Sequence, residues 1–139
     1  MKLKILICLS CGLLATSSFG GVGETEQQVE ARYGKPGKDL GTRENVHQLG
    51  YFSGGFMILV DFVNGISERE GFANPDSSPL SDEAISQILR MNILEGQKWL
   101  GQTSPREKEW QRSDGKAVAS CPGPGLFVFV RDVKYNPPK

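Results

Sequence analysis

The sequence predicts an α+β fold in which helices pack on antiparallel sheet. Two segments place apolar residues at helical spacing behind a hydroxyl-bearing cap residue, one at Thr25 and one at Ser81. Residues 56–63 alternate in the way that a half-buried strand requires, and glycine-rich turns separate several strand-like segments. The predicted order is helix, three strands, helix, three strands, which suggests two tandem units of one helix and a three-stranded meander.

The chain opens with a pattern typical of a secretory signal, residues 1–20. Two lysines precede an apolar stretch that is about half of the ~20 residues a helix needs to cross a bilayer. Small residues at Ser18 and Gly20 form the pattern that a signal peptidase recognises, with the Ala15–Ser17 pair as an alternative. We therefore expect cleavage near Gly20 and a mature single domain of residues 21–139, which is periplasmic or secreted.

The first helix is predicted from its ends. Thr25 and Gln28 have the spacing of a capping box, in which a hydroxyl and an amide satisfy backbone donors. Gly34 is a typical residue just beyond a helix, and the following proline prevents its resumption. Residues 35–45 are polar, and we expect a loop there.

Three strands follow, over residues 46–52, 56–63 and 66–72. The last two are joined by Asn64-Gly65, the favoured two-residue hairpin turn. In the middle strand the two-residue period places a set of apolar side chains on one face, which we expect to be core: Phe56, Ile58, Val60 and Phe62.

The second helix begins after Ser81, which is followed by two acidic residues that suit the helix dipole, and we expect it to end at Gly96. Turn sequences then separate three further strands, over residues 107–112, 116–121 and 126–132. The two helices superpose at a displacement of 56 residues, and this spacing suggests repeats over residues 24–72 and 81–133.

Composition excludes several classes of partner. The 16 basic side chains fall to 14 when Lys2 and Lys4 leave with the signal, against 16 acidic ones. This balance gives no basic patch for nucleic acid or anionic lipid. Beyond the signal, the longest apolar run is residues 56–60, so we expect no membrane span in the mature chain.

The cysteines exclude an internal disulfide. Cys8 and Cys11 lie within the signal, so Cys121 is alone in the mature chain. A lipid anchor at Cys11 is disfavoured because Leu9 stands one place too close to it. Two interpretations of Cys121 stay open, a buried apolar filler or a reactive thiol, and the first is the more typical.

No catalytic, cofactor or metal site is predicted. An enzyme would have to use the thiol of Cys121 with His47, the only histidine of the chain. One histidine and one mature cysteine cannot complete a conventional zinc site. Two acidic pairs share a strand face by their spacing, and we interpret them as solvated: Glu68 with Glu70, and Glu107 with Glu109.

Aromatic residues are the remaining candidates for binding a partner protein: Tyr51, Phe52, Trp99 and Trp110. Aromatic side chains in exposed positions are typical anchors of protein interfaces. The alternative is that they fill the space between helix and sheet, and Trp110 fits this alternative best because it lies in a predicted strand.

The first unit resembles a known family. The residues Thr25-x-x-Gln28-Val29 with Gly34-x-Pro36, and the segment 59–62 before its Asn64-Gly65 turn, look like the SmpA/OmlA family of BamE-like envelope proteins. The resemblance covers residues 24–70 and implies an envelope location, contacts with other proteins and no catalysis. This chain departs from the family in having one helix ahead of the strands and no well-placed lipid-bearing cysteine.

The function that these observations favour is a non-enzymatic binding module of the cell envelope or extracellular space, whose partner is another envelope or extracellular protein. Two alternatives stay open. One is a small thiol-dependent enzyme that uses Cys121 and His47, and the other is a structural homo-oligomeric envelope component.

Overall fold

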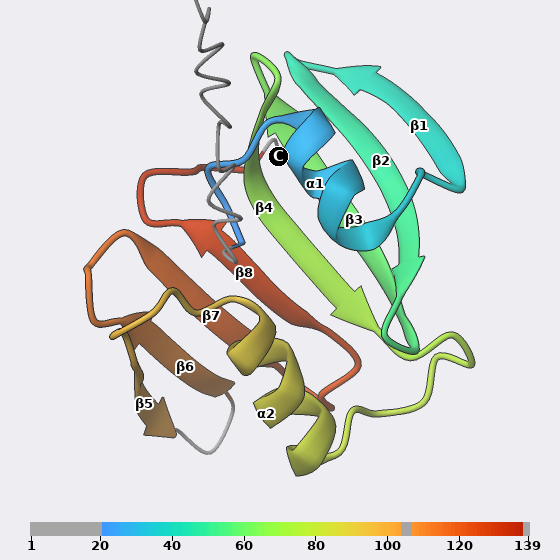
Figure 1. Cartoon of the computed structure of the whole chain (residues 1–139). Helices are drawn as coiled ribbons and strands as arrows, with labels where there is room; N and C mark the ends of the chain where they lie inside the picture. Colours follow the sequence, from blue (N-terminus) through green and yellow to red (C-terminus); the bar gives the residue numbers. More distant parts are fainter. Residues whose placement is uncertain (1–20, 104–106, 138–139) are drawn as a thin grey trace, which may run out of the picture.

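The computed structural model describes residues 21–103 and 107–137, which form an antiparallel sheet of eight strands with two helices against it (Figure 1). The strands are ordered β1-β2-β3-β4-β8-β7-β6-β5 across the sheet. The predicted signal, its cleavage position and the lipid-anchor question at Cys11 lie outside the described residues. In the described part, no helix is long and apolar enough to cross a membrane.

Helix α1 (Glu26–Tyr33) has the ends that the sequence predicts. The Thr25 hydroxyl accepts from the backbone N–H of Gln28 at 3.3 Å, and the Gln28 side chain accepts from the backbone N–H of Thr25 at 2.9 Å. Gly34 ends the helix with φ +87°, a conformation that favours glycine. The capping box and the glycine stop are therefore confirmed.

Four strands follow α1, where the sequence predicts three. They are β1 (Lys38–Arg43), β2 (Val46–Ser53), β3 (Phe56–Val63) and β4 (Ile66–Ala73). The expectation of a loop over residues 35–45 is wrong, because β1 pairs with β2 at the edge of the sheet. A bulge within β1 places Gly41 at φ +84°, and its N–H donates to the Asp39 carboxylate at 2.8 Å.

Helix α2 (Asp82–Met91) begins as predicted, with the Ser81 hydroxyl accepting from the backbone N–H of Ala84 at 3.1 Å. It ends at Asn92 and not at Gly96, so the predicted stop is wrong by one turn. Ile85 and Ile88 are buried against the sheet.

The second half also has four strands in place of the predicted three: β5 (Trp99–Thr103), β6 (Glu107–Arg112), β7 (Ala117–Pro122) and β8 (Val128–Asp132). The first of these was not expected. Strand β8 pairs with β4 from Phe72↔Val128 to Arg69↔Arg131, so the two halves share one continuous sheet.

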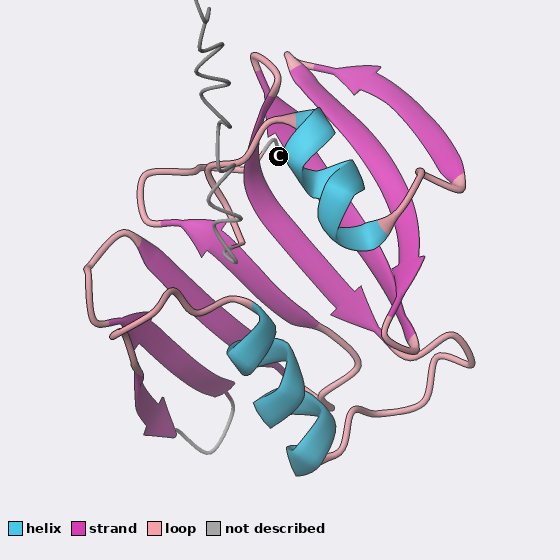
Figure 2. Ribbon diagram, in the orientation of Figure 1, coloured by secondary structure: helices cyan, strands magenta, loops and turns pink. Residues whose placement is uncertain are grey.

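The predicted fold class is therefore wrong. The expectation was helices packed on sheet, in two units of one helix and three strands. The structure is β-rich: eight strands form one sheet, and the two helices are only 8 and 10 residues long (Figure 2). Whether residues 24–72 and 81–133 are repeats of one another stays a prediction.

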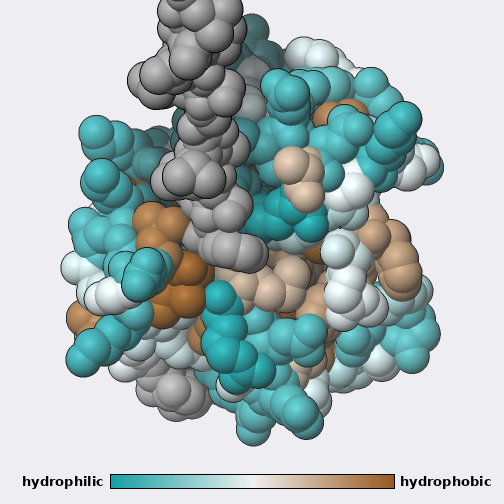
Figure 3. Space-filling view, viewed as in Figure 1, coloured by the Kyte–Doolittle hydropathy of each residue, from teal (hydrophilic) through white to brown (hydrophobic). Residues whose placement is uncertain are grey.

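The core lies between the sheet and the two helices. The predicted core face of β3 is confirmed, since Phe56, Ile58, Val60 and Phe62 are all at most 5% exposed. Residues of α1, α2 and the central strands complete one cluster, including Val29, Tyr33, Phe72, Ile88, Val128 and Val130. On the helix-bearing surface, hydrophilic residues cover most of the view, with apolar residues gathered between α1 and α2 (Figure 3).

Candidate protein-binding face

Both described helices lie on the same face of the sheet (Figure 1). Helix α1 packs there through Tyr33, whose ring lies 6.4 Å from that of Phe72. Helix α2 is joined to β5 on that face, because the Trp99 indole N–H donates to the carbonyl of Leu89 at 2.8 Å. Side chains alternate along strands, so every second residue points to the opposite surface, which we call the open face.

Large apolar side chains are exposed on the open face. Phe52 and Met57 are paired across β2 and β3 and are 64% and 53% exposed. Leu100 in β5 is 60% exposed, and Phe127, just before β8, is 46% exposed and stacks on Phe129 with ring centroids 5.7 Å apart. These four residues come from both halves of the chain.

The open face is hollowed over β5, β6, β7 and β8. The hollow has a volume of about 770 Å³. Side chains of both apolar and polar types line it, among them Leu100, Val118, Ser120, Gln111, Glu109 and Arg131. The hollow therefore offers apolar contacts, neutral hydrogen-bonding groups and one charged group of each sign among these residues.

A buried carboxylate also lies on the open face, in the half of the sheet that β1 to β4 form. Asp61 of β3 is 1% exposed and forms an ion pair with Arg69 at 2.7 Å. Its carboxylate also accepts from the Gln48 amide at 2.7 Å and from the Tyr135 hydroxyl at 2.9 Å. Burial raises the pKa of Tyr135 to about 12, so its phenol stays protonated and donates. These bonds hold the segment after β8 against β3.

The Arg69 guanidinium also lies over the ring of Phe129, 5.4 Å from its centroid. In the ladder, Arg69 stands opposite Arg131 of β8, so two guanidinium-bearing residues meet where the halves join. Arg131 donates to the backbone carbonyls of the turn after β8, including that of Val133 at 3.5 Å. The Arg69 charge is balanced by Asp61, and the Arg131 guanidinium bonds to backbone carbonyls.

A second ionic network lies on the helix-bearing face. Arg32 of α1 bonds to the Glu24 carboxylate at 2.7 Å and to Glu70 of β4, which is fully buried. The Tyr33 hydroxyl donates to Glu70 at 2.8 Å. The expectation that Glu70 is solvated is wrong. Its partner Arg32 is 38 residues away, and no local pattern reveals that pairing.

Burial and ion pairing both shift the pKa values of these groups. It raises the pKa of the Glu24 carboxyl and of the Tyr33 phenol, because a charge in the interior loses its hydration. The ion pairs with Glu70 and Glu24 raise the pKa of Arg32, despite its burial. The cation therefore holds two carboxylates in place, and the network anchors α1 to the sheet.

The structure does not bring His47 and Cys121 together. His47 lies in β2 and bonds to Glu26 and Asp39, each at 3.0 Å. Cys121 lies in β7, four strand spacings away in the sheet, which corresponds to about 19 Å. Cys121 is buried, 5% exposed, as the filler interpretation expects.

The four aromatic candidates lie in three different environments. Tyr51 is part of the core, with its ring 5.9 Å from that of Tyr33. Trp99 and Trp110 are half-buried and pack against the core cluster beneath α2. Phe52 alone of the four is exposed on the open face.

Sequence reasoning missed three residues of this face: Met57, Leu100 and Phe127. The alternation of β3 already places Met57 on the face opposite the core, so the sequence pattern was sufficient to identify this residue. Leu100 lies in a strand that the sequence did not predict. Phe127 lies within the predicted strand over residues 126–132, although β8 begins at Val128, but it was not among the aromatic candidates. Among residues 21–103 and 107–137, no three His, Cys, Asp or Glu side chains are arranged to hold a metal ion.

No protein-family model matches the chain, and no curated protein matches it. Two solved structures resemble it weakly. A cysteine-rich secretory protein from Staphylococcus aureus has a TM-score of 0.48 and 10% identity, over 81% of this chain and 45% of that one. An extracellular protein containing an SCP domain from Bacillus anthracis has a TM-score of 0.47 and 10% identity, over 96% and 50%. The chain spans about half the length of these proteins.

Proposed function

We propose that the mature domain is an exported, non-enzymatic binding module that recognises another protein through the open face of its sheet. One observation carries this proposal. Four of the large apolar side chains exposed in the described part of the chain lie on this face: Phe52, Met57, Leu100 and Phe127. Large apolar side chains that are exposed on one surface favour an interaction site there. Export is supported by the signal pattern of residues 1–20.

The dimensions of the open face favour a protein as the partner. Eight strands span seven spacings, or about 34 Å. A specific protein interface needs about 800 Å² from each partner, which a surface of this width can supply. The hollow beside Leu100 and the exposed pair of Phe52 and Met57 would serve as apolar contacts, with Arg131 and Glu109 orienting the partner.

The proposal can be tested with matched lysine variants. A double variant, Leu100→Lys with Phe127→Lys, places charge on the open face. Ser86→Lys is the control, because Ser86 is also exposed but lies in α2, on the opposite face of the sheet. Each purified mature protein is used as bait in native envelope extracts and culture medium, and retained proteins are quantified by mass spectrometry.

We expect a protein that the wild type and Ser86→Lys retain equally and that the double variant loses. The three baits should melt within a few degrees of one another, because surface substitutions usually change stability by less than about 0.5 kcal/mol. Equal retention by all three folded baits, or retention by none, contradicts the proposal. Sizing of the wild type in solution shows whether the partner is a second copy.

A further inference from the structure

The buried amide of Asn92 has an oxygen without a partner. Asn92 follows α2 and is 0% exposed. Its Nδ2 donates to the carbonyl of Ile88 at 2.9 Å, but its Oδ1 has no hydrogen-bond partner among the described residues. The orientation of the amide is fixed, because the reverse would place two carbonyl oxygens against each other. A buried acceptor without a donor destabilises the folded state, because it has lost its hydrogen bonds to water.

Gly21 lies directly against this oxygen. It is buried, and its φ of +81° favours glycine. A Cβ added to Gly21 would lie 2.6 Å from Asn92 Oδ1. One of the four tetrahedral positions around the Gly21 Cα therefore points at the unpartnered acceptor.

The segment that carries Gly21 is fixed on β4. The backbone N–H of Gly23 donates to the Ser67 carbonyl at 2.7 Å, and that of Glu24 donates to the Ser67 hydroxyl at 3.0 Å. Ser67 N–H donates in return to the Glu24 carbonyl at 2.7 Å. In Figure 1 this blue segment, which precedes α1, lies beside β4.

We propose that the mature protein begins at Gly21 and that its α-ammonium group donates to Asn92 Oδ1. A turn of about 120° around the Cα–C bond moves the nitrogen to the tetrahedral position that faces the oxygen. That position is 2.6 Å from Oδ1, close to the usual length of a charge-assisted hydrogen bond. A terminal glycine can make this turn because no residue precedes it.

The proposal rests on the predicted signal and includes one covalent step. A signal peptidase hydrolyses the Gly20–Gly21 bond with one water: Gly20 leaves as a carboxylate, and Gly21 gains an amine that takes up a proton. Before cleavage this nitrogen belongs to a peptide bond and the preceding chain is attached to it. Among the described residues, the cation that bonds to Asn92 is Arg112, which donates to the Asn92 backbone carbonyl at 3.4 Å and is paired with Asp114 at 3.0 Å.

The first test is the mass of the protein purified after natural export. We expect a single form that begins at Gly21. A mature form that begins at Ser18, as the alternative cleavage pair predicts, or at any other residue overturns the proposal.

The second test compares mature proteins that begin at Gly21 or at Gly20, each with Asn92 or with Asn92→Ala. With Asn92 present, we expect the additional residue to lower Tm by about 4 °C or more, because it removes a charge-assisted hydrogen bond. In the Asn92→Ala pair the difference should disappear. Acetylation of the Gly21 amine should lower Tm similarly, and this comparison stands if Asn92→Ala does not fold. Equal Tm values for the free, extended and acetylated proteins overturn the proposal.

Discussion

At the scale of single residues, the fold depends on charges that it buries. Glu70 is fully buried beneath α1, and its carboxylate is held there by Arg32 and by the Tyr33 hydroxyl. A buried ion pair adds little compared with an apolar pair of the same shape, but the loss of one partner leaves an uncompensated charge. The structure therefore predicts that the loss of Arg32 destabilises the protein more than the loss of a cation on the surface.

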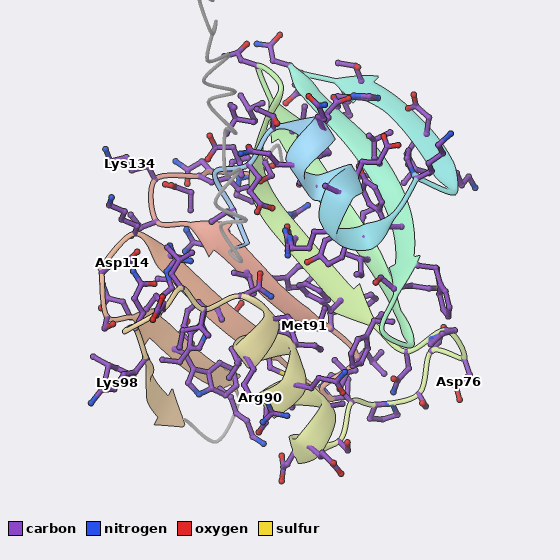
Figure 4. All side chains as sticks on the ribbon, viewed as in Figure 1. Asp76, Arg90, Met91, Lys98, Asp114 and Lys134 are labelled. Atoms are coloured by element: carbon purple, nitrogen blue, oxygen red, sulfur yellow. The ribbon has the colours of Figure 1, made fainter. Side chains whose placement is uncertain are left out.

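We expect Arg32→Met to lower the free energy of unfolding by about 3 kcal/mol at neutral pH, because two buried carboxylates, Glu24 and Glu70, lose their cation. The deficit should shrink as pH falls, since burial raises the pKa of the Glu24 carboxyl and its protonation removes one uncompensated charge. Urea unfolding at two pH values measures both effects. Arg90→Met is the control, because Arg90 is exposed on α2 (Figure 4), and we expect it to lose less than about 1 kcal/mol. Equal losses in the two variants would contradict the role of Arg32.

His47 predicts a pH dependence of opposite sign. A hydrogen bond to Glu26, and a smaller contribution from the one to Asp39, raise the pKa of its imidazole, so the folded state favours the charged form. A raised pKa stabilises the fold below the unfolded value, about 6.5, and the gain is lost as pH rises through the folded pKa. The stability advantage of wild type over His47→Gln should therefore be larger near pH 6 than near pH 9, as measured by urea unfolding. An advantage that grows with pH would exclude this role.

At the scale of elements, the ends of helices are the features that sequence determines most directly. Both N-terminal caps are confirmed, since Thr25 and Ser81 accept backbone N–H groups three residues on. The alternation of β3 likewise predicts its buried face correctly, because half-buried strands need apolar side chains at every second position. Each of these signals lies within a few neighbouring residues.

The elements that sequence reasoning missed depend on distant contacts. Strand β1 is exposed along its whole length and carries no apolar alternation, so only its pairing with β2 makes it a strand. In β5, a Cβ at Gly101 would lie 2.6 Å from the Trp110 ring, so the glycine makes room for the indole of the neighbouring strand. The burial of Glu70 and the composition of the open face also could not be predicted from neighbouring residues. Both depend on which strands lie side by side in the sheet.

The capping box gives a prediction for α1. Thr25→Ala removes the acceptor for the Gln28 N–H, and we expect the free energy of unfolding to fall by about 1 kcal/mol. Thr42→Ala is a matched control, because Thr42 is exposed in β1 and caps no helix. Thermal unfolding followed by circular dichroism measures both variants. A similar change in the two would show that the cap contributes nothing specific.

At the scale of the whole molecule, the two halves are held together by the β4–β8 ladder as well as by the shared core. Four residue pairs form the ladder, and Gly71↔Phe129 lies within it. The Phe129 ring fills the space beside the glycine, since a Cβ at Gly71 would lie 3.1 Å from its nearest ring atom. A sheet that is continuous across this junction should unfold as one unit.

The variant Gly71→Val tests whether the two halves of the sheet unfold together. The added side chain must displace Phe129, and overpacking of this kind costs about 1–3 kcal/mol. Both tryptophans, Trp99 and Trp110, lie in the second half, so their fluorescence reports on that half while circular dichroism reports on the whole sheet. We expect the two signals to give coincident urea transitions in wild type, and Gly71→Val to lower both midpoints together. Ala73→Val, at the half-buried end of β4, should change them less. Transitions that separate would mean that the halves fold independently, and a face that extends across both could not then act as one binding surface.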